Sequence, residues 1–120
     1  MRVRVVDDIA AAATDGRLHQ DLVPGKIYEV LSVADGFFRL SGESDDPVLY
    51  PPEILKIVDP TIPKGWIFEM INLDLPESKL RPPWFMLGPP EFLVPGFWER
   101  YHDGRSDAIE IYEEVKKRYE

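Results

Sequence analysis

The sequence predicts a mainly β protein that ends in an α-helix, with a five-stranded barrel in its N-terminal half. Over residues 1–59, short runs rich in β-branched and aromatic side chains alternate with turn signals, which is typical of small antiparallel strands. Residues 106–120 show instead an apolar stripe at helical spacing. Between these regions, two apolar runs in a proline-rich stretch predict a β-hairpin.

Turn signals delimit the five strands of the predicted barrel. Asp35-Gly36 favours a tight hairpin because both residues tolerate positive φ. Pro51-Pro52 cannot extend a ladder, since two successive residues lack an N–H group, so a helical turn is expected at 51–54. We expect the strands at residues 3–6, 27–33, 37–40, 48–50 and 54–58, and another helical turn at 9–13 within the long first loop.

This order of elements resembles the Src-homology-3 type of small barrel over about half of the chain. Phe37-Phe38 stands where that family has paired tryptophans, and Pro51-Pro52-Glu53-Ile54 stands at its helical turn. Val5-Val6-Asp7-Asp8 replaces its Ala-Leu-Tyr-Asp-Tyr signature. The resemblance implies a ligand groove lined by aromatic and proline side chains with acids at its rim. The implied site residues are Phe37, Tyr50, Pro51, Glu53, Asp35, Asp45 and Asp46.

Residues 60–120 are expected to form a proline-rich extension that packs on the barrel of residues 1–59. The runs 66–73 and 84–87 predict the two strands of the hairpin, and residues 95–102 predict a short helix. The final helix has Ser106 or Asp107 as its expected N-cap. The extension either leaves the groove of the barrel open or covers it.

Composition and charge restrict the classes of function. The chain carries a net charge of −8 and shows no basic patch, so binding to nucleic acid or to an anionic membrane is not expected. The absence of cysteine excludes disulfides, thiolate zinc sites and a cysteine nucleophile. Asp7 and Asp8 interrupt any signal-peptide core, and no apolar run approaches about 20 residues, so a cytoplasmic location is expected.

The sequence contains one cluster that could act in general acid–base chemistry. His102 lies beside Asp103 and close to Glu99, but no nucleophile is placed next to it, and we favour a turn between two helices as the explanation of the cluster. His19 is expected to be a solvated loop side chain. Metal-ligand spacings and phosphate-binding glycine loops do not occur, so no catalytic residue, metal or cofactor is predicted.

Three classes of function remain open at this point. The favoured class is a non-catalytic protein-binding domain for a basic protein; the alternatives are a structural subunit of an assembly and an enzyme that uses His102. The runs Leu49-Tyr50-Pro51-Pro52 and 96–104 also resemble small bacterial stand-alone proteins, some of which are immunity proteins that neutralise a toxin. That resemblance implies a basic toxin as the partner of the acidic surface. The sequence leaves the oligomeric state open.

Overall fold

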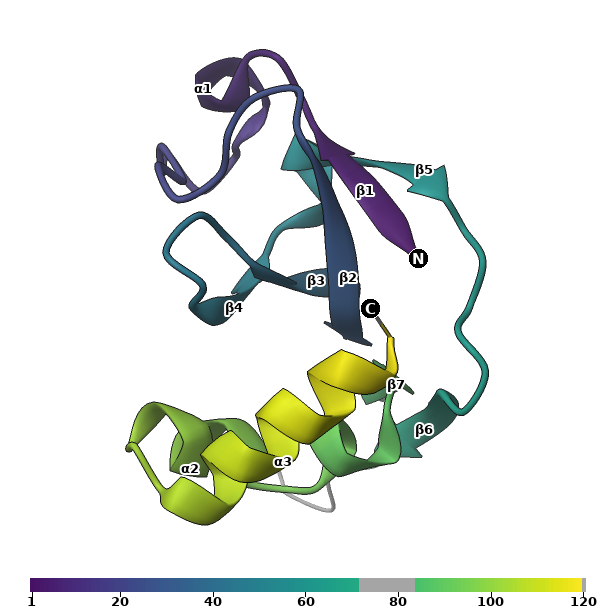
Figure 1. Cartoon of the computed structure of the whole chain (residues 1–120). Coiled ribbons are helices and arrows are strands. Elements are labelled where there is room, and N and C mark those ends of the chain that lie inside the picture. Colours follow the sequence, from purple (N-terminus) through teal and green to yellow (C-terminus); the bar gives the residue numbers. More distant parts are fainter. Residues whose placement is uncertain (72–83, 120) are drawn as a thin grey trace, which may run out of the picture. The chain divides into compact units, whose positions relative to one another are not determined.

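The computed structural model describes residues 1–71 and 84–119 and divides the chain into two compact units (Figure 1). The first unit spans Met1–Ile62 and the second spans Pro63–Glu120. Antiparallel strands make up most of the first unit, whereas the second combines a hairpin with helices. The predicted class, mainly β with a C-terminal α-helix, is confirmed. Closure of the strands into a barrel remains a prediction.

The first unit follows the turn signals of the sequence. Asp35 and Gly36 have φ values of 51° and 85°, so the chain reverses direction within two residues. The five expected strands and both helical turns are confirmed. In chain order they are β1 (Arg2–Val5), α1 (Ile9–Ala12), β2 (Ile27–Ala34), β3 (Phe37–Ser41), β4 (Pro47–Tyr50), the 3-10 helix η1 (Pro52–Ile54) and β5 (Leu55–Asp59).

The strands of the first unit are hydrogen-bonded in the order β4-β3-β2-β1-β5, and each pair is antiparallel. Within the first unit, strand β2 is shared between two partners: residues 27–29 pair with β1, and residues 30–34 pair with β3. The register shifts between Val30 and Ser32, where β2 exchanges one partner for the other. An irregularity of this kind bends a strand, so β2 can serve two parts of one sheet.

The core of the first unit consists mainly of side chains at alternate positions of its strands, which point to the same face. Val3 and Val5 are fully buried on β1, and Leu40 is fully buried on β3. Ile54 closes the core from η1, because the prolines before it turn the chain inward. The remaining buried apolar side chains of this unit are Ile9, Leu22, Tyr28, Val30, Val33 and Tyr50.

The second unit contains the expected hairpin, short helix and final helix. Its described elements are β6 (Ile67–Ile71), β7 (Trp84–Gly88), the 3-10 helix η3 (Pro90–Leu93), α2 (Phe97–His102) and α3 (Ser106–Arg118). Strands β6 and β7 pair antiparallel, while the loop expected at 74–81 lies outside the described residues. The sequence did not predict η3. It begins at Pro90, and proline suits a first helical position because that position needs no N–H donor.

Aromatic rings form the core of the second unit. Phe92 of η3 lies 4.9 Å from the ring of Trp98 and 5.4 Å from that of Phe97, centroid to centroid. Tyr112 of α3 stacks on the same Phe92 ring at 5.9 Å. Helix α3 thus docks through one face, as its apolar stripe predicts, with Ala108 and Val115 buried on either side of Tyr112.

The prediction that Ser106 or Asp107 is the N-cap of α3 is wrong. The N-cap residue is Arg105, and its side chain makes no capping hydrogen bond. Ser106 is already helical, and Asp107 lies in the first turn, where its carboxylate is 3.9 Å from Nε of Arg100. An acidic side chain in the first turn still interacts favourably with the helix dipole, so the helix begins without a capping box.

Candidate functional site

The loop between β1 and β2, residues 6–26, is fastened to two other segments of the first unit. The hydroxyl of Thr14 donates to Oε1 of Glu53 in η1 at 2.7 Å. The carboxylate of Asp21 accepts the backbone N–H of Ser44 at 2.8 Å and its hydroxyl at 2.9 Å. The long loop, η1 and the β3–β4 turn therefore meet near the end of β4, where Tyr50 lies.

Tyr50 is a buried residue at this meeting point. Its side chain is only 4% exposed, and its ring lies 5.7 Å from that of His19, edge to face. Burial, followed by the negative charges of Asp21 and Asp46, raises the pKa of the Tyr50 hydroxyl to about 12. Tyr50 consequently supports the surface from beneath rather than presenting an open aromatic face.

His19 does not behave as the sequence predicts. The expectation of a solvated side chain is wrong, because the His19 side chain is only 8% exposed. Its Nε2 lies 3.0 Å from a carboxylate oxygen of Asp15, and its backbone is left-handed with φ of 47°. The carbonyl of His19 accepts the N–H of Leu22, which closes a turn. The His19 ring packs on the Tyr50 ring from this turn.

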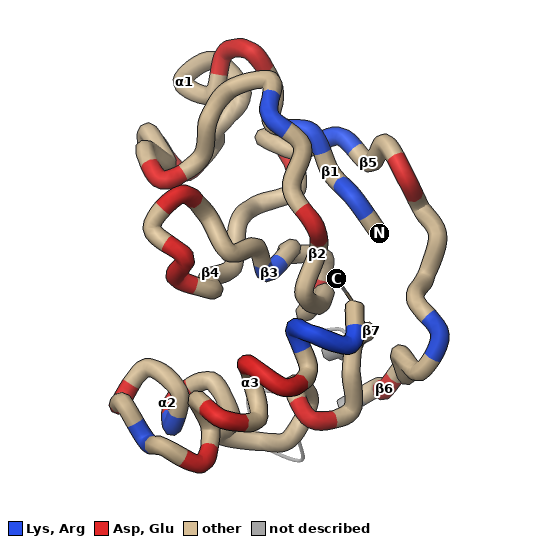
Figure 2. The backbone as a smooth tube through the Cα atoms, in the orientation of Figure 1, with Lys and Arg blue, Asp and Glu red and all other residues tan. Residues whose placement is uncertain are grey.

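Acidic side chains collect around the His19–Tyr50 pair, and we call this set the acidic loop face. Hydrogen bonding from Thr14 lowers the pKa of Glu53, although the nearby charge of Asp15 opposes that shift. Figure 2 shows the contrast within the first unit: acids gather along the loops beside α1 and β4, while basic residues lie on β1 and β5. The acidic loop face comprises Asp15, Asp21, Asp46 and Glu53.

A second group of polar contacts supports this face from the side. The Tyr28 hydroxyl accepts the N–H of Val23 at 2.9 Å and donates to Oε1 of Glu43 at 2.7 Å. Lys26 pairs with the same carboxylate, and hydrogen bonds from Lys26 and then Tyr28 lower the pKa of Glu43. Since its charge is already matched by Lys26, Glu43 acts as a support for the loops.

The structure separates the predicted site residues into two groups. Phe38 pairs with Tyr50 across β3 and β4, so these two side chains share one face of the sheet. Its neighbour Phe37 therefore belongs to the opposite face, where it is 43% exposed beside the turn that contains Asp35. Tyr50, Glu53 and Asp46 come together, whereas Phe37 and Asp35 do not join them.

The two remaining predicted residues have local structural roles. Pro51 is buried and caps η1. Asp45 has left-handed backbone geometry, with φ of 59°, and its carboxylate accepts the Ser41 hydroxyl at 2.5 Å. Asp45 thus holds the β3–β4 turn beside the acidic loop face.

Sequence reasoning missed Asp15 and Asp21 of this face, and it missed the packing of His19 on Tyr50. All three lie in an irregular loop, where periodicity carries no information about side-chain direction. The spacing of four between Asp15 and His19 was the one available signal, and outside a helix it does not imply contact.

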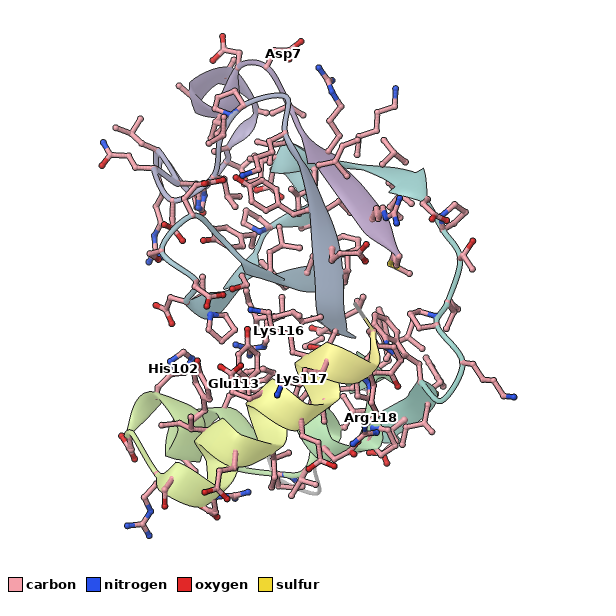
Figure 3. The ribbon with its side chains drawn as sticks, viewed as in Figure 1. Asp7, His102, Glu113, Lys116, Lys117 and Arg118 are labelled. Carbon is pink, nitrogen blue, oxygen red and sulfur yellow. The ribbon has the colours of Figure 1, made fainter. Side chains whose placement is uncertain are left out.

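His102 lies at the end of α2 and is exposed (Figure 3). Its ring centroid is 5.4 Å from that of Tyr101 and 6.4 Å from that of Trp98. Asp103 ends the helix by donating its backbone N–H to the carbonyl of Glu99. Across the described parts of the chain, no three histidine, aspartate or glutamate side chains are grouped to hold a metal ion.

The raised pKa of Tyr50 predicts a loss of stability in alkali. A tyrosine has a pKa of about 10 when unfolded, and that of Tyr50 is about 12 in the folded chain. The folded state therefore holds its proton more tightly, and the associated stability is complete below pH 10 and declines as pH rises to 12. Urea unfolding between pH 9 and 12 should show this decline, and Tyr50→Phe should make it shallower. An unchanged slope in that variant would contradict the assignment.

Comparisons with known proteins provide no relative for this chain: no family model, curated protein or solved structure matches it. Within residues 1–71 and 84–119, no helix is both long and apolar enough to cross a bilayer.

Proposed function

We propose that the first unit is a small barrel of the Src-homology-3 type and serves as a non-catalytic protein-binding domain. Three features support the barrel: the strand order β4-β3-β2-β1-β5, the division of β2 between two partners, and η1 immediately before the last strand. The loop after β1 is also the longest in this unit, as in that type of barrel.

The acidic loop face is the observation that carries the binding proposal. Two loops and η1 hold four carboxylates near a buried tyrosine, and hydrogen bonds fix three of them, Asp15, Asp21 and Glu53, before any partner arrives. Fixed acidic side chains attract a basic surface over a distance and pair with arginine or lysine on contact. The partner that fits this face is a basic protein, and a basic toxin of the kind neutralised by immunity proteins belongs to that class.

Phe37 supplies a second contact on the other face of the sheet. It is a half-exposed aromatic ring next to Asp35, and a cation can stack on such a ring while it pairs with the neighbouring carboxylate. In this proposal Phe37 slows dissociation of the partner, and the acidic loop face governs the rate of association.

Charge removal at the β3–β4 turn tests the acidic face. In the double variant Asp45→Asn/Asp46→Asn, asparagine still tolerates the left-handed backbone at position 45 while two negative charges are lost. We expect association with an immobilised lysine- and arginine-rich peptide to slow by about tenfold and its salt dependence to flatten. The matched control, Glu113→Gln/Glu114→Gln, removes two charges from exposed positions of α3 and should leave association unchanged.

Phe37→Ala tests the second contact. The same peptide should dissociate several-fold faster from this variant, with little change in the association rate. If the affinity for the peptide changed neither with salt nor with any of these substitutions, the proposal would be refuted. Preferential binding of an acidic peptide would also refute it.

A further inference from the structure

The outer edge of the hairpin in the second unit is open to a further strand. Strand β6 pairs with β7 along one edge, and within residues 1–71 and 84–119 no strand pairs with its other edge. A free edge presents a row of backbone N–H and C=O groups that can hydrogen-bond to an added strand. All four residues from Ile67 to Met70 are exposed, so this edge is accessible.

Strand β6 lacks the features that protect the end strands of the first unit. There, β4 begins at Pro47, which has no N–H group, and β5 carries Lys56 and a register shift against β1. Prolines, lysines and bulges of this kind discourage pairing between edges. In contrast, β6 pairs with β7 in an unbroken register from Ile67 to Ile71 and contains neither proline nor lysine. The edge of β6 is therefore suited to pairing.

One face of the hairpin offers apolar contacts to an added strand. Phe68 and Met70 of β6 are 59% and 61% exposed. Their direct partners on β7 are Leu87 and Phe85, respectively, so the four side chains share one face. The Phe68 ring also stacks on the Phe85 ring, which makes this apolar face continuous across the two strands. A strand beside β6 can bury Phe68 and Met70 with apolar side chains of its own.

The opposite face of β6 carries one negative charge. Glu69 is exposed and points away from Phe68 and Met70 by strand alternation. Its carboxylate has no ion-pair or hydrogen-bond partner among the residues that the structure describes. A lysine or arginine opposite Glu69 forms a favourable cross-strand pair, whereas a like charge there is unfavourable. A second copy of this chain fits less well, since it carries a net charge of −8 and its own Glu69.

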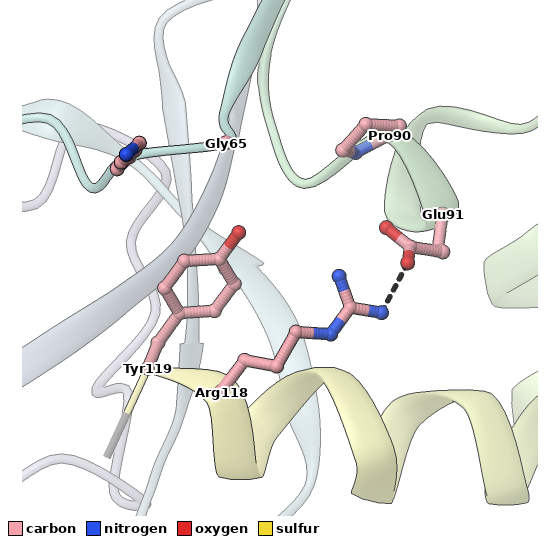
Figure 4. A pocket seen from close by; sticks show the side chains of 6 residues that line it. Gly65, Pro90, Glu91, Arg118 and Tyr119 are labelled. Atoms are coloured by element: carbon pink, nitrogen blue, oxygen red, sulfur yellow. Dashed lines mark hydrogen bonds and ion pairs between the residues drawn. The ribbon is translucent and has the colours of Figure 1, made fainter.

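The chain is fixed in position where it enters β6. The N–H of Trp66 donates to the carbonyl of Pro63, which closes a turn before the strand. Figure 4 shows the pocket beside this turn, with the hydroxyl of Tyr119 at the end of α3 directed toward Gly65. A Cβ at Gly65 would stand 3.1 Å from that hydroxyl, so the turn and the end of α3 are closely packed. A strand edge that is ordered before a partner arrives binds at a lower entropic cost.

We propose that the edge of β6 binds an extended segment of a partner protein in which apolar and basic residues alternate. The backbone of that segment pairs with β6 and adds a third strand to the hairpin. Its apolar side chains pack on Phe68 and Met70, and its basic side chains face Glu69. This site lies in the second unit and does not depend on the function proposed for the first unit.

The experiment uses the full chain, labelled with nitrogen-15, and a heptapeptide of alternating lysine and valine with blocked ends. Titration should shift the amide signals of residues 67–70, with a dissociation constant below about 1 mM. Two altered peptides keep the charge of the first. One is N-methylated at every residue and has no backbone donors, and the other places all lysines before all valines. Each should bind β6 at least about tenfold more weakly, because strand addition needs both the donors and the alternation.

A pair of matched variants tests the charge at Glu69. Glu69→Lys replaces a favourable cross-strand pair by a like-charge pair, so it should weaken binding of the alternating peptide by about fivefold. Glu113→Lys makes the same change of charge on an exposed part of α3 and should leave binding at β6 unchanged (Figure 3). The altered peptides test the unaltered chain, so they remain decisive if Glu69→Lys disturbs folding.

Several results would overturn the proposal. Equal binding of the three peptides would refute strand addition, as would the absence of shifts at residues 67–70 up to about 10 mM peptide. Shifts confined to the acidic loop face would support the function proposed for the first unit and refute a site at β6. Signals of residues 67–70 that move with protein concentration alone would assign the edge to a second copy of this chain instead.

Discussion

Replacing Phe92 by alanine should destabilise the second unit by about 3–5 kcal/mol, the usual cost of truncating a buried phenylalanine. Phe92 is 2% exposed and touches the rings of Phe97, Trp98 and Tyr112. Its removal therefore opens a cavity at the point where η3, α2 and α3 meet. Urea unfolding followed by tryptophan fluorescence measures the loss, because Trp98 packs directly on the deleted ring.

Phe68→Ala is the matched control for that experiment. Phe68 is 59% exposed on β6, and its ring stacks on that of Phe85 at 6.0 Å between ring centroids. The same chemical change should cost less than about 1 kcal/mol there, since little apolar area leaves the interior. Similar losses of stability for the two variants would show that Phe92 is not the centre of the core.

Gly42→Ala should destabilise the first unit by about 1–3 kcal/mol, because an added methyl group has no space. A Cβ at Gly42 would lie 2.2 Å from a carboxylate oxygen of Asp21 and 2.7 Å from its backbone carbonyl oxygen. The long loop must then move away from the β3–β4 turn, which breaks the bonds between Asp21 and Ser44. Urea unfolding measures the change in stability, and amide spectra report which loops move.

Gly16→Ala is the control, because it introduces backbone strain without the steric clash expected at Gly42. Gly16 has φ of 71°, and no atom lies within 4 Å of a Cβ placed there, so alanine introduces strain without a collision. The expected cost is about 1 kcal/mol, and the signals of the β3–β4 turn should not shift. If Gly42→Ala caused no more change than Gly16→Ala, the close approach of Asp21 would be refuted.

Most of the fold could be predicted because local chemistry decides it. Asp35-Gly36 and Pro51-Pro52 allow few backbone conformations, so the hairpin and η1 follow from those residues alone. The N-terminus of α3 was harder to predict, because Arg105, Ser106 and Asp107 are consecutive and tertiary contacts select among them. The start of η3 at Pro90 was missed since a proline pair indicates a break as readily as a first helical turn.

The candidate site was less accessible to sequence reasoning. The sequence can assign a residue to a loop, but the atoms that its side chain contacts depend on the conformation of the whole loop. Asp21 bonds to Ser44, 23 positions away, and no local pattern indicates that contact. Strand alternation places Phe37 and Phe38 on different faces of the sheet. Only the register of β3 with β4 shows that Tyr50 lies on the same face as Phe38.

The interior place of β1 has a consequence for the order in which the first unit assembles. Strands β2, β3 and β4 are consecutive and connected by short turns, so they form a meander of low contact order that can assemble early. Strand β1 lies between β2 and β5, and Arg2 pairs with Asp59 from the far end of the same unit. During synthesis, β1 leaves the ribosome before β5 and therefore keeps one edge unpaired until β5 emerges.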